Sequence, residues 1–166
     1  MTSGAWVSLF SGGKDSSWAL YQALQRDLPV ERLVTVHPEG DSYMYHVPAT
    51  ELASLAAESI DIPLVDVHPD DFGAEDVPDA GVQGDEELQP LEAALEELAS
   101  DLEGGIAGLT AGAVESEYQT SRIRAMCDRL GIDLFAPLWQ EDPVELAEAM
   151  FDAGFEIRIV QVAAYG

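Results

Sequence analysis

The sequence contains little cysteine, little lysine and no long apolar run. Cys127 is the only cysteine among 166 residues, which excludes an intrachain disulfide and any CxxC metal or redox site. The apolar runs fall far short of the roughly 20 residues that cross a bilayer. The first residues also lack the basic and apolar parts of a secretory signal. We therefore expect a soluble, cytoplasmic protein with no membrane contact.

Basic residues are scarce as well: seven Lys and Arg stand against 32 Asp and Glu, a formal net charge of −25. No Lys or Arg occurs between Arg32 and Arg122. Such a charge repels itself in ordinary salt, but at molar salt the screening length falls to about 3 Å and most of the repulsion disappears. Because 47% of the residues are hydrophobic, we interpret the chain as a folded protein of a halophilic archaeon. A disordered chain and a specialised acidic binding protein are the other interpretations.

The hydrophobic pattern alternates between short β-like runs and longer helical ones, and the length fits a single domain over residues 1–166. This pattern predicts an α/β fold with a doubly wound, mostly parallel five-stranded sheet flanked by helices. The strands are expected at 5–10, 33–36, 63–67, 105–110 and 134–136, with a short β-like stretch at 42–47 and a final strand at 155–164. The helices are expected at 15–26, 48–60, 88–102, 117–130 and 143–153. Residues 69–87 are expected to form an exposed acidic loop.

A glycine-rich turn lies between the first expected strand and the first expected helix. It contains six residues suited to holding polyphosphate: Ser11, Gly12, Gly13, Lys14, Asp15 and Ser16. Helix N-termini bind anions through their unpaired N–H groups, and glycines let the backbone come close to an oxyanion. Lys14, the only lysine in the chain, adds a point charge. Asp15 could cap the helix or hold a Mg²⁺ ion that bridges phosphates.

The turn has neither the spacing of a Walker A loop nor that of a GxGxxG dinucleotide turn. A purely structural Gly-rich turn is the alternative interpretation. The complete string at 11–16 resembles the SGGxDS signature (PP-loop) of the N-type ATP pyrophosphatases. This resemblance implies an ATP-binding domain with the adenine nucleotide alpha hydrolase-like (HUP) fold, and cleavage of ATP between the α- and β-phosphates.

Four further segments, at 42–48, 112–122, 136–139 and 154–164, resemble the diphthine–ammonia ligase family. That resemblance implies an ATP-dependent ligase that adenylates the diphthine carboxylate of elongation factor 2 and aminates it with ammonia, releasing AMP and pyrophosphate. Mg²⁺, ATP, ammonia and elongation factor 2 are the implied cofactors and partners. The family usually continues past residue 166 with a Glu-Gly-Gly-Glu/Asp segment. We therefore expect a truncated chain, a shortened homologue or a protein that lacks the acceptor site.

Candidate site residues follow from the phosphate turn and these segments. If the first and fourth strands are neighbours, the turn at 11–16 and the loop at 110–116 face one crevice. The catalytic candidates are Lys14, Asp15 and Arg122, with Asp15 also the metal candidate. The remaining nucleotide-binding candidates are Thr35, Val36, His46, Gly112, Ser116, Tyr118 and Gln119. Ser116 and Gln119 could instead form a capping box, and Arg122 a surface salt bridge.

Three other residues have mainly structural interpretations. Cys127 is expected to be a small buried hydrophobe, and Arg129 a structural residue. Trp139 is expected either to line the pocket or to pack in the core. Gly131 is expected to cap the helix at 117–130.

Two other functions remain open at this stage. A non-catalytic ATP- or AMP-binding module would share the phosphate turn. Another PP-loop adenylating enzyme, such as a tRNA-modifying one, would also share it. A tRNA thiolase would need paired cysteines, and a basic track for RNA is missing, so no direct nucleic-acid binding is expected. A homodimer is left open.

Overall fold

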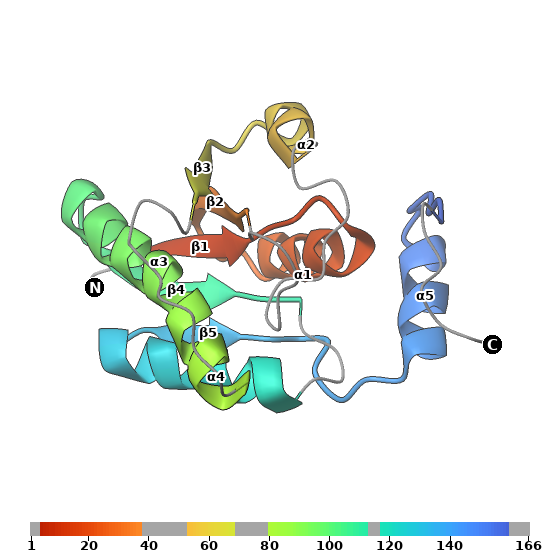
Figure 1. Cartoon of the computed structure of the whole chain (residues 1–166). Helices are drawn as coiled ribbons and strands as arrows, with labels where there is room; N and C mark the ends of the chain where they lie inside the picture. Colours follow the sequence, from red (N-terminus) through yellow and green to blue (C-terminus); the bar gives the residue numbers. More distant parts are fainter. Residues whose placement is uncertain (1–3, 38–52, 69–79, 113–116, 160–166) are drawn as a thin grey trace.

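Five parallel strands form one sheet with helices on both faces (Figure 1). The computed structural model describes residues 4–37, 53–68, 80–112 and 117–159. The strands are β1 (Ala5–Leu9), β2 (Val30–Val36), β3 (Leu64–Val67), β4 (Ile106–Thr110) and β5 (Asp133–Phe135). The helices are α1 (Lys14–Gln25), α2 (Ala53–Ile60), α3 (Ala80–Asp101), α4 (Glu117–Leu130) and α5 (Pro143–Asp152). The predicted α/β class is confirmed.

The order of the strands is β3-β2-β1-β4-β5. The chain therefore runs from β1 outward to β2 and β3, then crosses back to place β4 on the other side of β1. All four neighbouring pairs are parallel. In such a sheet the connections on either side of the reversal leave in opposite directions, so a crevice opens at the carboxyl ends of the two central strands. Here those two strands are β1 and β4.

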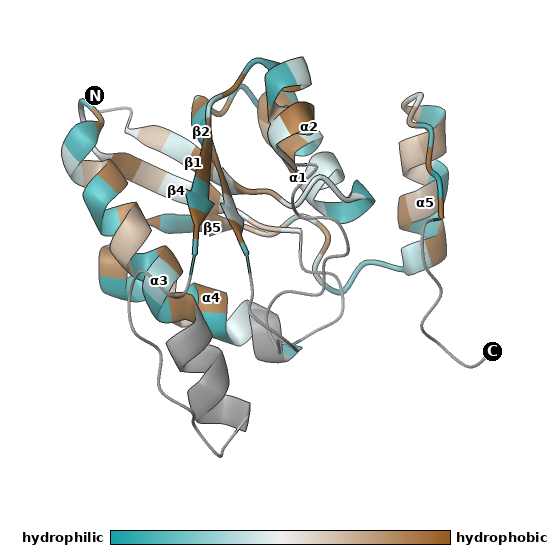
Figure 2. Cartoon of the chain, turned by 45° about the horizontal axis from the view of Figure 1, so that its top comes forward, coloured by the Kyte–Doolittle hydropathy of each residue, from teal (hydrophilic) through white to brown (hydrophobic). Residues whose placement is uncertain are grey.

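Two apolar layers hold the helices against the sheet. Helices α3 and α4 cover one face, where Leu91, Leu95 and Met126 pack with Val7 and Leu109 of the strands. Helices α1 and α2 cover the other face through a second cluster, which contains Phe10, Leu20, Leu33, Ala53 and Ala57. Figure 2 shows α3 and α4 on the opposite side of the strands from α1 and α2. Since the strands are covered on both faces, their sequences are apolar runs rather than alternating patterns.

Helix α5 packs against α1 rather than against the sheet. Asp142 caps α5 by accepting hydrogen bonds from the N–H groups of Val144 (2.8 Å) and Glu145 (3.0 Å). The buried face of α5 contributes Leu146 and Met150 to a cluster that also holds Trp18, Ala19 and Leu138. The segment between β5 and α5 is thereby joined to the first half of α1.

Helix α3 is longer than the sequence pattern predicts. It begins at Ala80, inside the stretch 69–87 that was expected to be a loop. Glycines at 81 and 84 suggested the loop, but each costs a helix only about 1 kcal/mol relative to alanine. The buried residues Leu88 and Leu91 anchor the helix, which then extends toward its N-terminus. Neither α3 nor any other helix in the described ranges is both long and apolar enough to cross a membrane.

The strand expected at 155–164 is not formed by residues 155–159, which have no regular secondary structure. Phe155 and Ile157 instead pack into the apolar cluster between α1 and α5. These two apolar side chains, which alternate with polar residues, therefore contact helices instead of a sheet. Residues 160–164, the β-like stretch at 42–47 and the first part of the helix expected at 48–60 lie outside the described residues.

Helix α4 matches its predicted bounds, and its C-terminus is closed as expected. Gly131 has a φ of +70°, and its N–H donates to the carbonyl of Asp128 (3.2 Å). The next N–H, of Ile132, donates to the carbonyl of Cys127 (3.0 Å). This pair of bonds is a Schellman motif, which requires a left-handed residue and therefore favours glycine.

Cys127 provides a probe of folding that can be measured in salt. The side chain is buried on α4, and burial, together with the charge of Asp128, raises the pKa of its thiol to about 11. Because only the thiolate reacts, iodoacetamide at pH 8 should label the folded chain very slowly in molar KCl. Labelling should accelerate as KCl is lowered, since self-repulsion of the acidic surface then opens the fold. The chain unfolded in guanidinium is the positive control, and rapid labelling in molar KCl would contradict the buried position.

Candidate phosphate-binding site

The turn at residues 11–16, here called the phosphate turn, leaves the N-terminus of α1 open to an anion. Gly13 is the N-cap of this helix and no side chain caps it. The first helical hydrogen bond runs from the N–H of Ser17 to the carbonyl of Gly13 (3.1 Å). The N–H groups of Lys14, Asp15 and Ser16 precede that bond and have no partner within the helix. The suggestion that Asp15 caps the helix is wrong, because Asp15 lies inside the first turn.

Two serines fix the shape of the turn. The Oγ atoms of Ser11 and Ser16 lie 3.0 Å apart, and the N–H of Ser11 donates to Ser16 Oγ (3.1 Å). Ser16 Oγ also donates to the carbonyl of Gly13 (3.3 Å), whose own N–H donates to Ser11 Oγ (3.3 Å). Gly12 has a φ of +83°, which side chains other than hydrogen rarely allow. The serine hydroxyls therefore preorganise the loop.

Lys14 and Asp15 carry the charges of the turn. Lys14 Nζ lies 2.6 Å from Asp15 Oδ1, and the two side chains are 49% and 36% exposed. Both groups thus remain accessible at the start of α1. Among the described residues, no group of three or more His, Cys, Asp or Glu could hold a metal by itself. Mg²⁺ commonly uses one or two carboxylates and takes its other ligands from water and phosphates, and Asp15 fits that mode.

Gly112 brings the second loop onto the phosphate turn. Strand β4 lies beside β1, where Thr110 Oγ1 donates to Ser8 Oγ (2.9 Å) in the buried sheet. Two residues later, a Cβ on Gly112 would lie only 2.8 Å from the backbone of Asp15 and Ser16. The backbone of Gly112 therefore packs directly on the first turn of α1. The expected neighbours β1 and β4 are confirmed, while a shared crevice between the turn at 11–16 and the loop at 110–116 stays a prediction, because residues 113–116 lie outside the described residues.

The end of β2 forms the other side of the crevice. Thr35 and Val36 are the last two residues of β2, and their side chains are buried. Only the backbone of these residues can therefore face a nucleotide. The next residue, His37, has its Nε2 2.7 Å from Asp66 Oδ1 and its ring stacked on His68, with 4.7 Å between the centroids. This cluster was not predicted, because it depends on the pairing of Thr35 with Asp66 between β2 and β3.

The candidates beyond β4 are only partly described. Arg129 donates to both carboxylate oxygens of Glu92 on α3 (3.0 and 3.1 Å), which confirms its structural interpretation. Arg122 is half-buried on α4, and its contact with phosphate stays a prediction. The side chains of Tyr118 and Gln119, and the whole of His46 and Ser116, lie outside the described residues.

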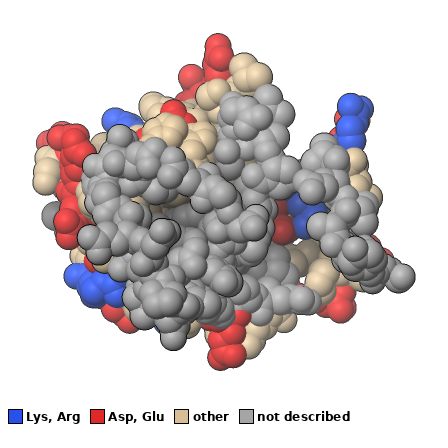
Figure 3. Space-filling model, in the orientation of Figure 1, with Lys and Arg blue, Asp and Glu red and all other residues tan. Residues whose placement is uncertain are grey.

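Acidic groups outnumber basic groups on the molecule. Figure 3 shows Asp and Glu side chains spread around the rim of one face, with fewer Lys and Arg side chains between them. At the start of α1, the positive groups are the open N–H groups of the helix and Lys14, whose ammonium is paired with Asp15.

Several known proteins are similar to this chain. Residues 4–134 match the family model described as the diphthamide synthase N-terminal domain. The diphthine–ammonia ligase of Danio rerio is 31% identical over 174 residues, which cover 96% of this chain and 65% of that protein. The Homo sapiens protein of that name is 30% identical over 170 residues, covering 96% and 62% of the two chains. The Schizosaccharomyces pombe protein is 30% identical over 171 residues, covering 96% and 27%.

A solved structure supports the fold independently. It is described as a predicted subunit of tRNA methyltransferase from Methanocaldococcus jannaschii, and it superposes with a TM-score of 0.55 at 20% identity. The match covers 97% of this chain and 81% of that one. This chain spans less than two thirds of the length of the relatives named above. The family model nevertheless covers most of the chain, including the turn at 11–16 and Gly112. The chain therefore belongs to the diphthamide synthase N-terminal domain family.

Proposed function

We propose that this chain is an ATP-dependent ligase that adenylates a protein carboxylate and converts it to an amide with ammonia. The observation that carries the proposal is the open N-terminus of α1, where Lys14 and three backbone N–H groups lie beside the Gly112 turn. A pyrophosphate group fits such a site because its charge is spread over several oxygens that accept hydrogen bonds. The relatives are named diphthine–ammonia ligases, which supports diphthine as the acceptor, and we propose that this diphthine is carried by elongation factor 2.

The reaction would proceed in two steps. A carboxylate oxygen of the acceptor attacks the α-phosphorus of ATP, and the bond to the β-phosphate breaks to release pyrophosphate. The nitrogen of ammonia then attacks the acyl carbon, AMP leaves, and the nitrogen loses a proton to solvent. Lys14 and the N–H groups of α1 stabilise the charge that develops on the departing pyrophosphate. The serine hydrogen bonds hold the backbone of the turn, and so its N–H groups, in position before the nucleotide arrives.

Asp15 would hold Mg²⁺ together with the phosphates of ATP. Its carboxylate is exposed at the start of α1 and is paired only with Lys14 among the described residues, so it can turn toward a metal. Mg²⁺ would neutralise phosphate charge at this position. The Lys14 ammonium would then be released toward the phosphates.

The remaining candidates complete the proposed site. The backbone at the end of β2 would contact the adenine, since the side chains there are buried. Arg122 would contact phosphate or adenylate from α4. The further proposed contacts with nucleotide or acceptor come from Thr35, Val36, His46, Gly112, Ser116, Tyr118 and Gln119. A cytoplasmic location follows from the proposed substrate, and we propose no nucleic-acid ligand.

The reaction can be tested directly. The chain is incubated in molar KCl with ATP, Mg²⁺, ammonium and elongation factor 2 bearing diphthine. We expect repeated turnover to AMP and pyrophosphate only when acceptor and ammonium are both present, because without ammonium the reaction stops at the acyl-adenylate after one release of pyrophosphate. Tight ATP binding without turnover would instead indicate a nucleotide-binding module. AMP formation with tRNA in place of the elongation factor would indicate a tRNA-modifying enzyme.

Replacing Lys14 tests the phosphate site alone. Lys14→Gln should weaken binding of ATP by about 10- to 100-fold, since hydrogen bonds from a charged donor contribute roughly 1.5–3 kcal/mol. Isothermal titration calorimetry with a non-hydrolysable ATP analogue in molar KCl measures the loss. Arg158→Gln is the matched control, because Arg158 is exposed in residues 155–159 and its loss changes the net charge equally. Equal affinities of the two variants would place the phosphates elsewhere.

Replacing Gly112 tests the contact between the two loops. The Cβ of Gly112→Ala meets the backbone of Asp15 and Ser16 at 2.8 Å, so the start of α1 must shift. We expect a loss of about 1–3 kcal/mol in unfolding free energy and a clear loss of ATP affinity. Gly131→Ala is the control, because its φ of +70° makes alanine strained while nothing lies within 4 Å of the new Cβ. That variant should lose stability in a urea titration but bind ATP normally.

A further inference from the structure

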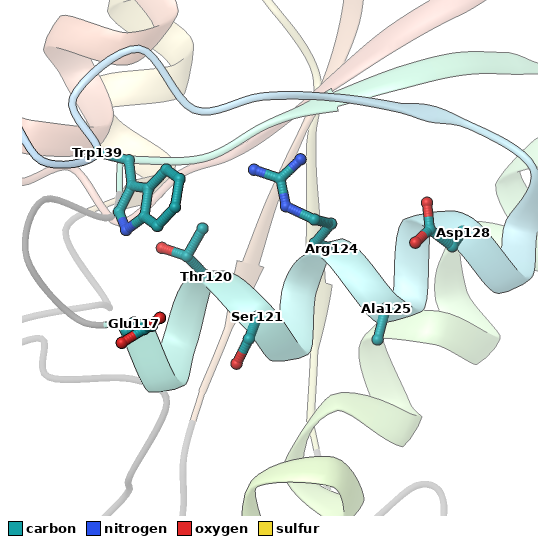
Figure 4. A pocket seen from close by; sticks show the side chains of 7 residues that line it. All are labelled: Glu117, Thr120, Ser121, Arg124, Ala125, Asp128 and Trp139. Carbon is teal, nitrogen blue, oxygen red and sulfur yellow. The ribbon is translucent and has the colours of Figure 1, made fainter.

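A separate cavity lies between α4 and the segment that joins β5 to α5. Its volume is about 230 Å³, below the roughly 300 Å³ at which pockets for drug-sized ligands begin, so it suits one side chain better than a nucleotide. Six of its residues lie along one face of α4 and the seventh, Trp139, closes it (Figure 4). The lining residues are Glu117, Thr120, Ser121, Arg124, Ala125, Asp128 and Trp139. This face of α4 differs from the one that carries Arg129, which contacts α3.

The cavity contains a cation beside an aromatic ring. The guanidinium carbon of Arg124 lies 5.7 Å from the centroid of the Trp139 ring. In the part of the chain that the structure describes, no carboxylate lies within ion-pair distance of Arg124, although the chain has 32 acidic residues. Figure 4 shows the guanidinium directed toward Trp139 and away from the α4 backbone. The charge is therefore available to an anionic group that enters the cavity.

The cavity also contains a buried hydroxyl. Thr120 is 2% exposed, and its Oγ1 has no hydrogen-bond partner among the described residues. A buried polar group without a partner costs about 1–3 kcal/mol. Figure 4 shows this oxygen on the side of Trp139 and Glu117. A ligand oxygen at this position would accept a hydrogen bond from the hydroxyl and remove that cost.

The segment that carries Trp139 packs against helix α1, whose N-terminus is the candidate phosphate site. Leu138 precedes Trp139 and lies in the cluster that contains Trp18 and Ala19 of α1. Gly112, the last described residue before α4, packs on the backbone of Asp15 and Ser16 at the start of α1. The cavity has no lining residue from α1, so its link to the candidate phosphate site runs through these neighbouring residues.

We propose that this cavity receives the acceptor side chain, with its carboxylate paired to Arg124 and hydrogen-bonded by Thr120. The inference rests on the proposed function, because it names the subsite for that acceptor. Trp139 covers the apolar part of the side chain, and Glu117 faces any positive charge on it. An amide has no charge for the guanidinium to pair with. The cavity thus distinguishes the carboxylate substrate from the amide product and favours release of the product.

Binding of the two forms of the acceptor tests the assignment. Elongation factor 2 carrying the carboxylate and the factor carrying the amide are each titrated into the chain at one fixed KCl concentration. The wild-type chain should bind the carboxylate form about ten-fold or more tightly, as expected for charge-assisted hydrogen bonds. Arg124→Gln should abolish this preference, while Arg158→Gln should keep it. Equal binding of both forms by the wild type, no binding of either, or a preference retained by Arg124→Gln would overturn the proposal.

Thr120→Val supplies a readout that a purely structural role would not give. Removing a buried hydroxyl that has no partner in the described structure should leave the free chain as stable or more stable. The same change should weaken binding of the carboxylate form several-fold. A loss of stability with unchanged acceptor binding would show that Thr120 serves only the fold.

The two proposals fail in different ways. If the wild type forms AMP with the acceptor but Arg124→Gln keeps the preference for carboxylate, the cavity assignment fails and the ligase stands. If the carboxylate form binds through Arg124 but no AMP is formed, the assignment stands and the ligase fails.

Discussion

The backbone contact between Gly112 and the first turn of α1 organises the candidate site. It exists because β4 lies beside β1, so the loops that leave their carboxyl ends meet. A Cβ at this position would lie 2.8 Å from the backbone of Asp15 and Ser16, which leaves room for glycine alone unless α1 moves. Helix α4 begins at Glu117 and carries Thr120 and Arg124 on the face that lines the cavity.

Electrostatics at this site act at short range. The chain carries a formal charge of −25, so a polyphosphate is repelled by the molecule as a whole. At the start of α1, however, three N–H groups and Lys14 lie together, and molar salt screens distant charges more strongly than groups in contact. Molar salt would likewise screen distant acidic groups more strongly than a ligand in contact with Arg124, which lies beside Trp139 in the cavity. The positive charges of Lys14 and Arg124 can therefore act on a ligand that contacts them, although the molecule as a whole is negative.

Local patterns predicted those features that depend on neighbouring residues in the chain. The helix at 117–130 is predictable because the buried residues Ile123, Met126 and Cys127 recur at helical spacing. Its end is predictable because Gly131 can adopt the positive φ that closes a helix. The start of α3 was missed because glycines suggested a loop, whereas packing of Leu88 and Leu91 stabilises a longer helix. The strand expected at 155–164 was wrong for residues 155–159 because an apolar alternation can face helices as well as a sheet.

Local sequence specifies the candidate phosphate turn, since residues 11–16 need only a preceding strand and a following helix to present their N–H groups. It also determined the α/β class, because periodicity is a property of neighbouring residues. The contacts of that turn with other parts of the chain depend on the tertiary structure, and the expected approach of the loop at 110–116 was conditional on the order of the strands. The meeting of Gly112 with α1, and of Arg124 with Trp139, depends on strand order and on helix packing. Those contacts join residues far apart in the chain, and no local pattern encodes them.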